Sequence, residues 1–194
     1  MIFYQLTRPA SYLLIEDPSK WKIDWMIPFV ITLVMTISFY IIPGDEHWIG
    51  ANGFIKNLQG FLQILPGFYL ASLAAIATFN KDDLDYELPT PTPKISIKFV
   101  RSDRLHSKTI NLTRRRMLCY LFGYLTFLGL MLYLATVFAP IIVISAANHM
   151  ADWGTYLIIA SKSIFLLFFW QMIVITIFGL YQLCDRIHQV GDTE

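Results

Sequence analysis

The sequence predicts an all-α membrane protein with four transmembrane helices and a small cytoplasmic β-hairpin between the second and third helices. Composition is the first reason: of 194 residues, 56% are hydrophobic and only 15% are charged. Soluble domains carry about 25% charged residues, and a chain this poor in charge cannot cover itself with a polar surface. The second reason is that the hydrophobic residues gather in four long runs.

Each run is long enough to cross a bilayer, for which a helix needs about 20 apolar residues. The expected spans are 25–42, 61–79, 117–145 and 156–184. The first run follows a mixed N-terminal segment and has no small-residue cleavage site after it, so we expect a retained anchor rather than a secretory signal. The third run is longer than an upright span requires, so it should tilt or protrude.

Basic residues indicate the orientation of these spans. Nine fall in the central connection 80–116, three in the N-terminal segment 1–24 and one in the tail 185–194. The connection between the first two spans holds only Lys56. Because lysine and arginine favour the cytoplasmic side, all three basic segments are predicted to be cytoplasmic, joined by helical membrane parts at 25–79 and 117–184.

The central connection 80–116 contains the predicted hairpin. After an acidic, proline-rich beginning, residues 94–99 alternate polar and apolar side chains, as a half-buried strand does. A weaker alternation follows at 108–113, with a polar stretch 101–107 between the two. An isolated hairpin is only marginally stable, so we expect the N-terminal segment, another subunit or a partner protein to cover its apolar side chains.

This hairpin is the predicted partner-binding site, with folding onto its own chain as the alternative. An extended segment of a partner can add to the edge of such a sheet. The candidate residues are the basic and apolar side chains of the hairpin: Lys94, Ile95, Ile97, Lys98, Phe99, Arg101 and Arg104.

A stripe of small residues in the second span is a candidate helix-packing site. Gly67, Ala71 and Ala75 recur at every fourth position and therefore share one helix face. Small residues let helix backbones approach closely in lipid. The neighbour is either a helix of the same subunit or a helix of a second subunit.

The basic run Arg114, Arg115 and Arg116 directly precedes the third span and is expected to bind anionic lipid headgroups. Within the fourth span, Lys162 lies near the outer end and can reach the headgroups, unless it lines a pore or cavity. Gln171 is expected to bond a neighbouring helix, or to line the same cavity. Direct nucleic-acid binding is not expected.

Chemistry-bearing motifs do not occur in the sequence. No nucleophile–base arrangement, phosphate loop or zinc motif is present. We therefore predict no enzymatic activity, no cofactor and no metal site.

Three stretches carry a family resemblance. Residues 77–85 read Ala-Thr-Phe-Asn-Lys-Asp-Asp-Leu-Asp, residues 112–116 read Leu-Thr-Arg-Arg-Arg, and residues 121–125 read Leu-Phe-Gly-Tyr-Leu. Together with four spans and a short tail, they resemble the KwaA family, the membrane subunits of the Kiwa anti-phage defence system. The resemblance implies a bacterial inner-membrane sensor and scaffold that forms a homo-oligomer, such as a tetramer, and docks the soluble cytoplasmic subunit KwaB. An oligomeric channel or membrane-pore effector is the alternative, and a small transporter is a third.

Overall fold

The computed structural model of this chain describes residues 8–17, 20–41, 53–78, 85–86, 88, 92–101, 104–149 and 154–184. For residues 39–41, 97–101, 104–108, 139–140, 142–144, 146–149 and 155 it describes the backbone only. In chain order, the elements are the 3-10 helix η1 (Arg8–Leu14), the π-helix η2 (Lys22–Met26), α2 (Ile27–Ile41), α4 (Phe54–Thr78), β1 (Lys94–Arg101), β2 (Arg104–Asn111), α5 (Arg114–His149) and α6 (Gly154–Cys184).

Three helical stretches are long and apolar enough to cross a membrane: Phe54–Thr78, Arg114–Phe138 and Tyr156–Cys184. They match the second, third and fourth predicted spans, so the mostly helical class with apolar helices of membrane-spanning length is confirmed. The first predicted span corresponds to α2, which has 15 residues. At 1.5 Å per residue this is about 22 Å, short of a ~30 Å hydrocarbon core. The count of four spans is therefore not established by helix length, and the expected end of the first span, Ile42, lies outside the described residues.

Large apolar side chains cover the outside of the helices. They include Phe29, Val30, Leu33 and Val34 on α2, Phe61, Ile64 and Phe68 on α4, Phe138 and Ile141 on α5, and Ile164, Ile177 and Leu180 on α6. Soluble monomers rarely expose contiguous apolar patches of more than a few hundred Å². A surface of this kind on every long helix suits contact with lipid.

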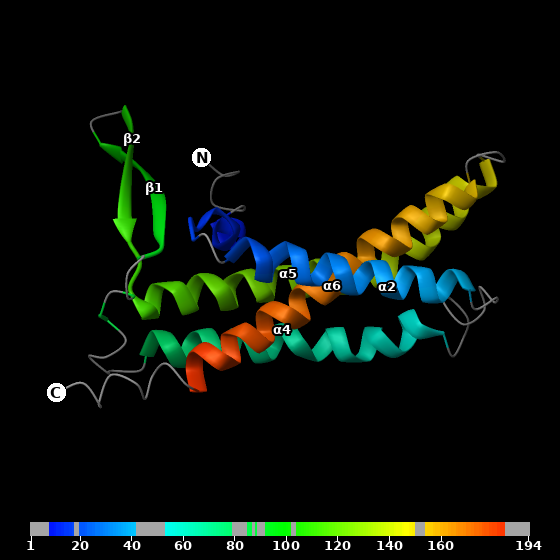
Figure 1. The fold of residues 1–194 in the computed structure, drawn as a ribbon. Coiled ribbons are helices and arrows are strands. Elements are labelled where there is room, and N and C mark those ends of the chain that lie inside the picture. The colour runs from blue at the N-terminus through cyan, green and yellow to red at the C-terminus, as the bar shows by residue number, and fades with distance from the viewer. Residues whose placement is uncertain are drawn as a thin grey trace.

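Helix α5 is the central element of the bundle, because it packs against α4, α6 and η1. The hairpin, the beginning of α5 and the C-terminal ends of α4 and α6 lie together at one end of the bundle (Figure 1). This arrangement brings the basic central connection and the end of α6 to the same side, as the predicted topology requires.

Two glycines allow close helix contact. At Gly129 of α5, a Cβ atom would lie 3.3 Å from Pro66 Cγ of α4 and 3.7 Å from Met172 Sδ of α6. At Gly179 of α6, a Cβ atom would lie 2.9 Å from Leu121 Cδ2 of α5. Neither glycine belongs to a four-residue repeat, which is why the sequence pattern did not single them out.

The predicted hairpin is confirmed, with longer strands than expected. β1 and β2 pair antiparallel, with Ile95 opposite Ile110 and Arg101 opposite Arg104. The strands therefore extend into the stretch 101–107, which we expected to be the polar connection. Backbone hydrogen bonds form the ladder, so pairing continues where the apolar alternation has ended.

Candidate functional site

The base of the hairpin is held on both sides by other parts of the chain. Beside β1, the Glu16 N–H donates to Lys94 O (3.0 Å) and the Lys94 N–H donates to Glu16 O (3.4 Å), forming an antiparallel bridge. On the other side, just beyond β2, the Leu88 N–H donates to Leu112 O (3.2 Å). These bonds attach the hairpin to the N-terminal segment and to the segment before β1.

Ile95 of the hairpin is buried against its own chain. It is 1% exposed and belongs to the same core cluster as Tyr12, Ile15 and Leu112. This residue is therefore covered by its own chain, and the N-terminal segment contributes Tyr12 and Ile15 to the cluster that contains it. Ile95 is consequently not available at the surface for a partner.

Beyond Glu16, the outer edge of β1 has no strand beside it among the described residues. Backbone groups alternate in direction along a strand, so the outward N–H and C=O groups that follow those of Lys94 belong to Ser96, Lys98 and Val100. The Lys94 side chain is exposed. For the other candidate residues only the backbone is described, and it lies in the β1–β2 ladder. These residues are Ile97, Lys98, Phe99, Arg101 and Arg104.

A buried ion pair in the N-terminal segment is the feature that sequence reasoning missed. Lys20 Nζ lies 2.5 Å from Asp24 Oδ2, and the two residues are 6% and 2% exposed. The Tyr12 hydroxyl donates to Asp24 Oδ1 (3.1 Å), and Lys20 Nζ lies 3.9 Å from the centre of the Tyr12 ring. Both carboxylate oxygens of Asp24 therefore have partners. The available signal was the spacing of four residues, which brings opposite charges together on a helix.

Burial and pairing act in opposite directions on this ion pair. Burial lowers the pKa of Lys20 and raises the pKa of Asp24, while each charge stabilises the other. Burial, reinforced by the nearby Asp24 carboxylate, also raises the pKa of Tyr12. The Tyr12 hydroxyl therefore keeps its proton and remains a hydrogen-bond donor to Asp24.

Gln171 connects this ion pair to α5 and α6. Its side chain is fully buried; Oε1 accepts a hydrogen bond from the Tyr124 hydroxyl (2.9 Å), and Nε2 donates to the backbone oxygen of Asp24 (3.0 Å). The Tyr124 ring also stacks on Tyr12, with centroids 5.4 Å apart. The expected hydrogen bond from Gln171 to a neighbouring helix is confirmed. Both polar ends of the side chain are used inside the bundle.

Arg8 anchors the beginning of the same segment. Its Nη2 donates to the Tyr120 hydroxyl of α5 (2.8 Å), and its guanidinium carbon lies 5.6 Å from the centre of that ring. Together with the ion pair, this contact packs the segment onto the bundle. We refer to residues 8–24 as the N-terminal strap, described here except for residues 18 and 19.

The small-residue stripe faces away from the core of the subunit. Gly67, Ala71 and Ala75 are exposed, and a Cβ atom at Gly67 would meet nothing within 4 Å. The buried face of α4 carries other residues, including Leu62 and Tyr69. No helix in the described part of this subunit covers the stripe, so the second subunit stays as the predicted neighbour.

We expect Ala71→Leu to break the predicted oligomer and leave the unfolding temperature of the monomer unchanged, because Ala71 is exposed in the subunit. Size-exclusion chromatography with light scattering in detergent measures the assembly, and a thermal melt measures the fold. Ala77→Leu is the matched control, since Ala77 is also exposed on α4 but lies about 120° away from Ala71 around the helix. An intact oligomer in the Ala71→Leu variant would remove the stripe from the interface.

The three arginines at the start of α5, Arg114, Arg115 and Arg116, lie in different environments. Arg115 forms a two-bond ion pair with Asp85, with Nε–Oδ1 at 2.8 Å and Nη2–Oδ2 at 3.1 Å, and its Nη1 donates to Ile76 O (3.2 Å). Arg114 is half-buried and Arg116 is exposed. The run therefore both ties α5 to α4 and presents a cation at the surface.

Lys162 is half-buried in α6, about two turns after the helix begins.

Among the described residues, no group of three or more His, Cys, Asp or Glu side chains is placed to hold a metal ion. Searches of protein-family models, curated proteins and solved structures return no match to this chain.

Proposed function

We propose that this chain is a non-enzymatic scaffold and sensor subunit of a bacterial inner membrane, which forms a homo-oligomer and recruits a soluble cytoplasmic partner through its hairpin. One observation carries the proposal. A two-stranded sheet stands at the end of an apolar helix bundle (Figure 1), and the outer edge of β1 beyond Glu16 has no strand partner among the described residues. Such an edge is a template for strand addition by another chain.

In this proposal α2 crosses the membrane as a fourth span. The chain is helical without a break from Lys20 to Ile41, and its part inside the predicted span, residues 25–41, is about 26 Å long at 1.5 Å per residue. The outward face of α2 is apolar, as contact with lipid requires. With four spans, the basic segments 1–24, 80–116 and 185–194 all face the cytoplasm, in keeping with the distribution of lysine and arginine.

The N-terminal strap supports a sensing role. One of its residues, Glu16, bonds the base of β1, and a few residues later Lys20 and Asp24 form the buried ion pair next to Gln171. The hairpin and the interior of the bundle are thus connected through one short stretch of chain. A change in the bundle that displaces Asp24 would pull on the hairpin.

The defence assignment rests on the resemblance of residues 77–85, 112–116 and 121–125 to the KwaA family. On that basis the soluble partner is a KwaB-type subunit. Recruitment by strand addition is the part of the proposal that the geometry supports directly, because it depends on the backbone of β1.

We expect Lys98→Pro to reduce capture of the KwaB-type soluble subunit by about tenfold or more, the loss that follows when roughly 1.4 kcal/mol of binding free energy is removed. Proline removes the outward N–H at Lys98 and leaves the β1–β2 bonds made by Ile97 and Phe99. Lys98→Ala is the matched control: it removes the same charge and keeps the N–H. Co-purification of the partner with full-length chain from detergent-solubilised membranes provides the measurement.

Charge reversal provides a second arm of this experiment. The combined Lys94→Glu, Lys98→Glu and Arg101→Glu variant should weaken capture of an acidic partner surface and leave membrane insertion intact. Undiminished capture by both the proline variant and the charge-reversed variant would assign recruitment to another surface.

A further inference from the structure

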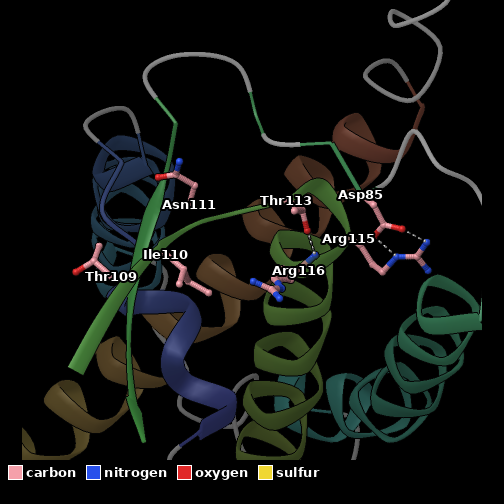
Figure 2. Close-up of a pocket in the computed structure, with 7 residues that line it drawn as sticks. All are labelled: Asp85, Thr109, Ile110, Asn111, Thr113, Arg115 and Arg116. Carbon is pink, nitrogen blue, oxygen red and sulfur yellow. Dashed lines mark hydrogen bonds and ion pairs between the residues drawn. The ribbon is translucent and has the colours of Figure 1, made fainter. Parts of the chain in front are cut away.

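A polar cavity of about 680 Å³ lies between the base of the hairpin and the first turn of α5 (Figure 2). Its residues come from three parts of the chain: Thr109, Ile110 and Asn111 from β2, Thr113, Arg115 and Arg116 from the start of α5, and Asp85 from the segment before β1. Most of its lining is polar. None of these contacts is needed for the strand addition proposed above, so the cavity calls for a separate explanation.

Arg116 provides the available positive charge of the cavity. The other arginine, Arg115, is neutralised by its two-bond ion pair with Asp85. Arg116 is exposed, and it has no carboxylate partner among the described residues. Its backbone N–H is bonded to Thr113 Oγ1 (3.4 Å), which fixes its position in the first turn of α5. A single net positive charge suits a singly charged anion.

The uncharged side of the cavity carries hydrogen-bonding groups. Thr109 and Asn111 line the cavity from β2, and in Figure 2 the Ile110 side chain between them points toward the α5 turn that holds Arg116. A hydroxyl and an amide both donate and accept hydrogen bonds. Such groups beside one cation suit a phosphate that carries neighbouring hydroxyl groups.

The position of the cavity indicates the source of that phosphate. Arg116 is the last basic residue before the apolar part of α5, so the cavity opens where the chain enters lipid. Exposed aromatic side chains occur at the same end of the bundle: Trp21 of the N-terminal strap is 65% exposed and Tyr86 is 58% exposed. Tryptophan and tyrosine concentrate at the level of the headgroups.

We propose that this cavity binds the phosphate of an anionic phospholipid headgroup. Arg116 pairs with the phosphate, and Asn111 and Thr109 bond the hydroxyl groups of the headgroup. The bound lipid joins β2 to α5 and thereby holds the hairpin at a defined position above the membrane. Free phosphate shares the negative charge of this ligand, and the position of the cavity beside the apolar part of α5 favours the lipid.

The test uses purified full-length protein in detergent, titrated with phosphatidylglycerol or phosphatidylcholine and followed by native mass spectrometry. Phosphatidylglycerol should bind about tenfold more tightly than phosphatidylcholine, and Arg116→Gln should remove about tenfold of that affinity, as loss of one charge-assisted contact does. Asn111→Asp, which places a carboxylate in the cavity, should have a similar effect. Lys22→Gln is the matched control, because Lys22 is exposed outside the cavity; its effect should stay within about twofold, as for a peripheral charge.

Three results would overturn the proposal. Equal losses in the Arg116→Gln and Lys22→Gln variants would show diffuse attraction by the basic surface. Equal affinity for the two lipids would show that the headgroup is not recognised. Displacement of phosphatidylglycerol by excess inorganic phosphate would show a site for free phosphate. Partner capture is measured separately, so failure here is distinguishable from failure of the scaffold function.

Discussion

Asp24→Ala is expected to destabilise the protein by about 3–5 kcal/mol, because it leaves the buried Lys20 ammonium without its partner. For a chain of this size, such a loss lowers the unfolding temperature by roughly 6–20 °C. The Tyr12 hydroxyl also loses the carboxylate oxygen to which it donates. A thermal melt of the detergent-solubilised protein measures the effect, and protease sensitivity of the strap reports whether it has left the bundle.

Two further variants separate the ion pair from general damage to the strap. Glu16→Ala removes an exposed carboxylate from the same segment and keeps the backbone bridge to Lys94; its effect should stay within about 0.5 kcal/mol. The triple variant Tyr12→Phe, Lys20→Met and Asp24→Leu replaces the polar groups by apolar ones of similar size, and should recover most of the stability, as in other buried pairs.

If the single Asp24→Ala variant has the same unfolding temperature as the wild type, the ion pair does not hold the strap on the bundle. If the triple variant is as unstable as the single one, the loss in Asp24→Ala arises from lost packing rather than from an unpaired charge. Either result would also weaken the sensing role, since that role requires the strap to connect the hairpin with the interior of the bundle.

The membrane helices and the hairpin could be predicted from the sequence because their signals are local. Three predicted spans are helices in the structure. Their C-terminal ends lie within a few residues of the predicted ends, as at Thr78 and Cys184, because the apolar run stops there. The alternation around Ile95 and Ile97 predicted β1 for the same reason. The strand ends were wrong, because ladder pairing continues through polar residues that carry no hydrophobic signal.

The buried polar cluster could not be predicted, because it depends on contacts between residues far apart in the sequence. In the sequence, Lys20 and Asp24 resemble ordinary exposed charges at the start of a helix. Their burial depends on the packing of Tyr12 against them. Gln171 and Tyr124 reach the same point from two other helices. Sequence reasoning identified the chemistry of Gln171 correctly, as a hydrogen bond to a neighbour, and could not identify the neighbour.

The same distinction applies to helix packing. A four-residue repeat shows that Gly67, Ala71 and Ala75 share a face, but it does not show what that face contacts, and in this subunit the face is outward. Gly129 has no such repeat and yet lies where α4 and α6 both approach α5. Close contact depends on where helices cross, which is a property of the whole bundle.

Gly129→Leu is therefore expected to destabilise the bundle by about 1–3 kcal/mol, the usual cost of forcing extra carbon atoms into a packed interior. Its Cβ alone would lie 3.3 Å from the rigid ring of Pro66, and the remaining leucine atoms would push α4 or α6 away from α5. Gly129→Ala should cost less, since a shift of a few tenths of an ångström accommodates one methyl group. Thermal melts of the detergent-solubilised monomer measure both variants.

Gly67→Leu provides the matched control. It is the same substitution on α4, next to Pro66 in the sequence, at a position where a Cβ meets nothing within 4 Å. The Gly67→Leu monomer should have the same unfolding temperature as the wild-type monomer, even if the variant no longer forms the predicted oligomer. A Gly67→Leu monomer that melts as low as Gly129→Leu would show that the stripe packs inside the subunit, and an unchanged Gly129→Leu melt would show that α4, α5 and α6 do not meet closely at Gly129.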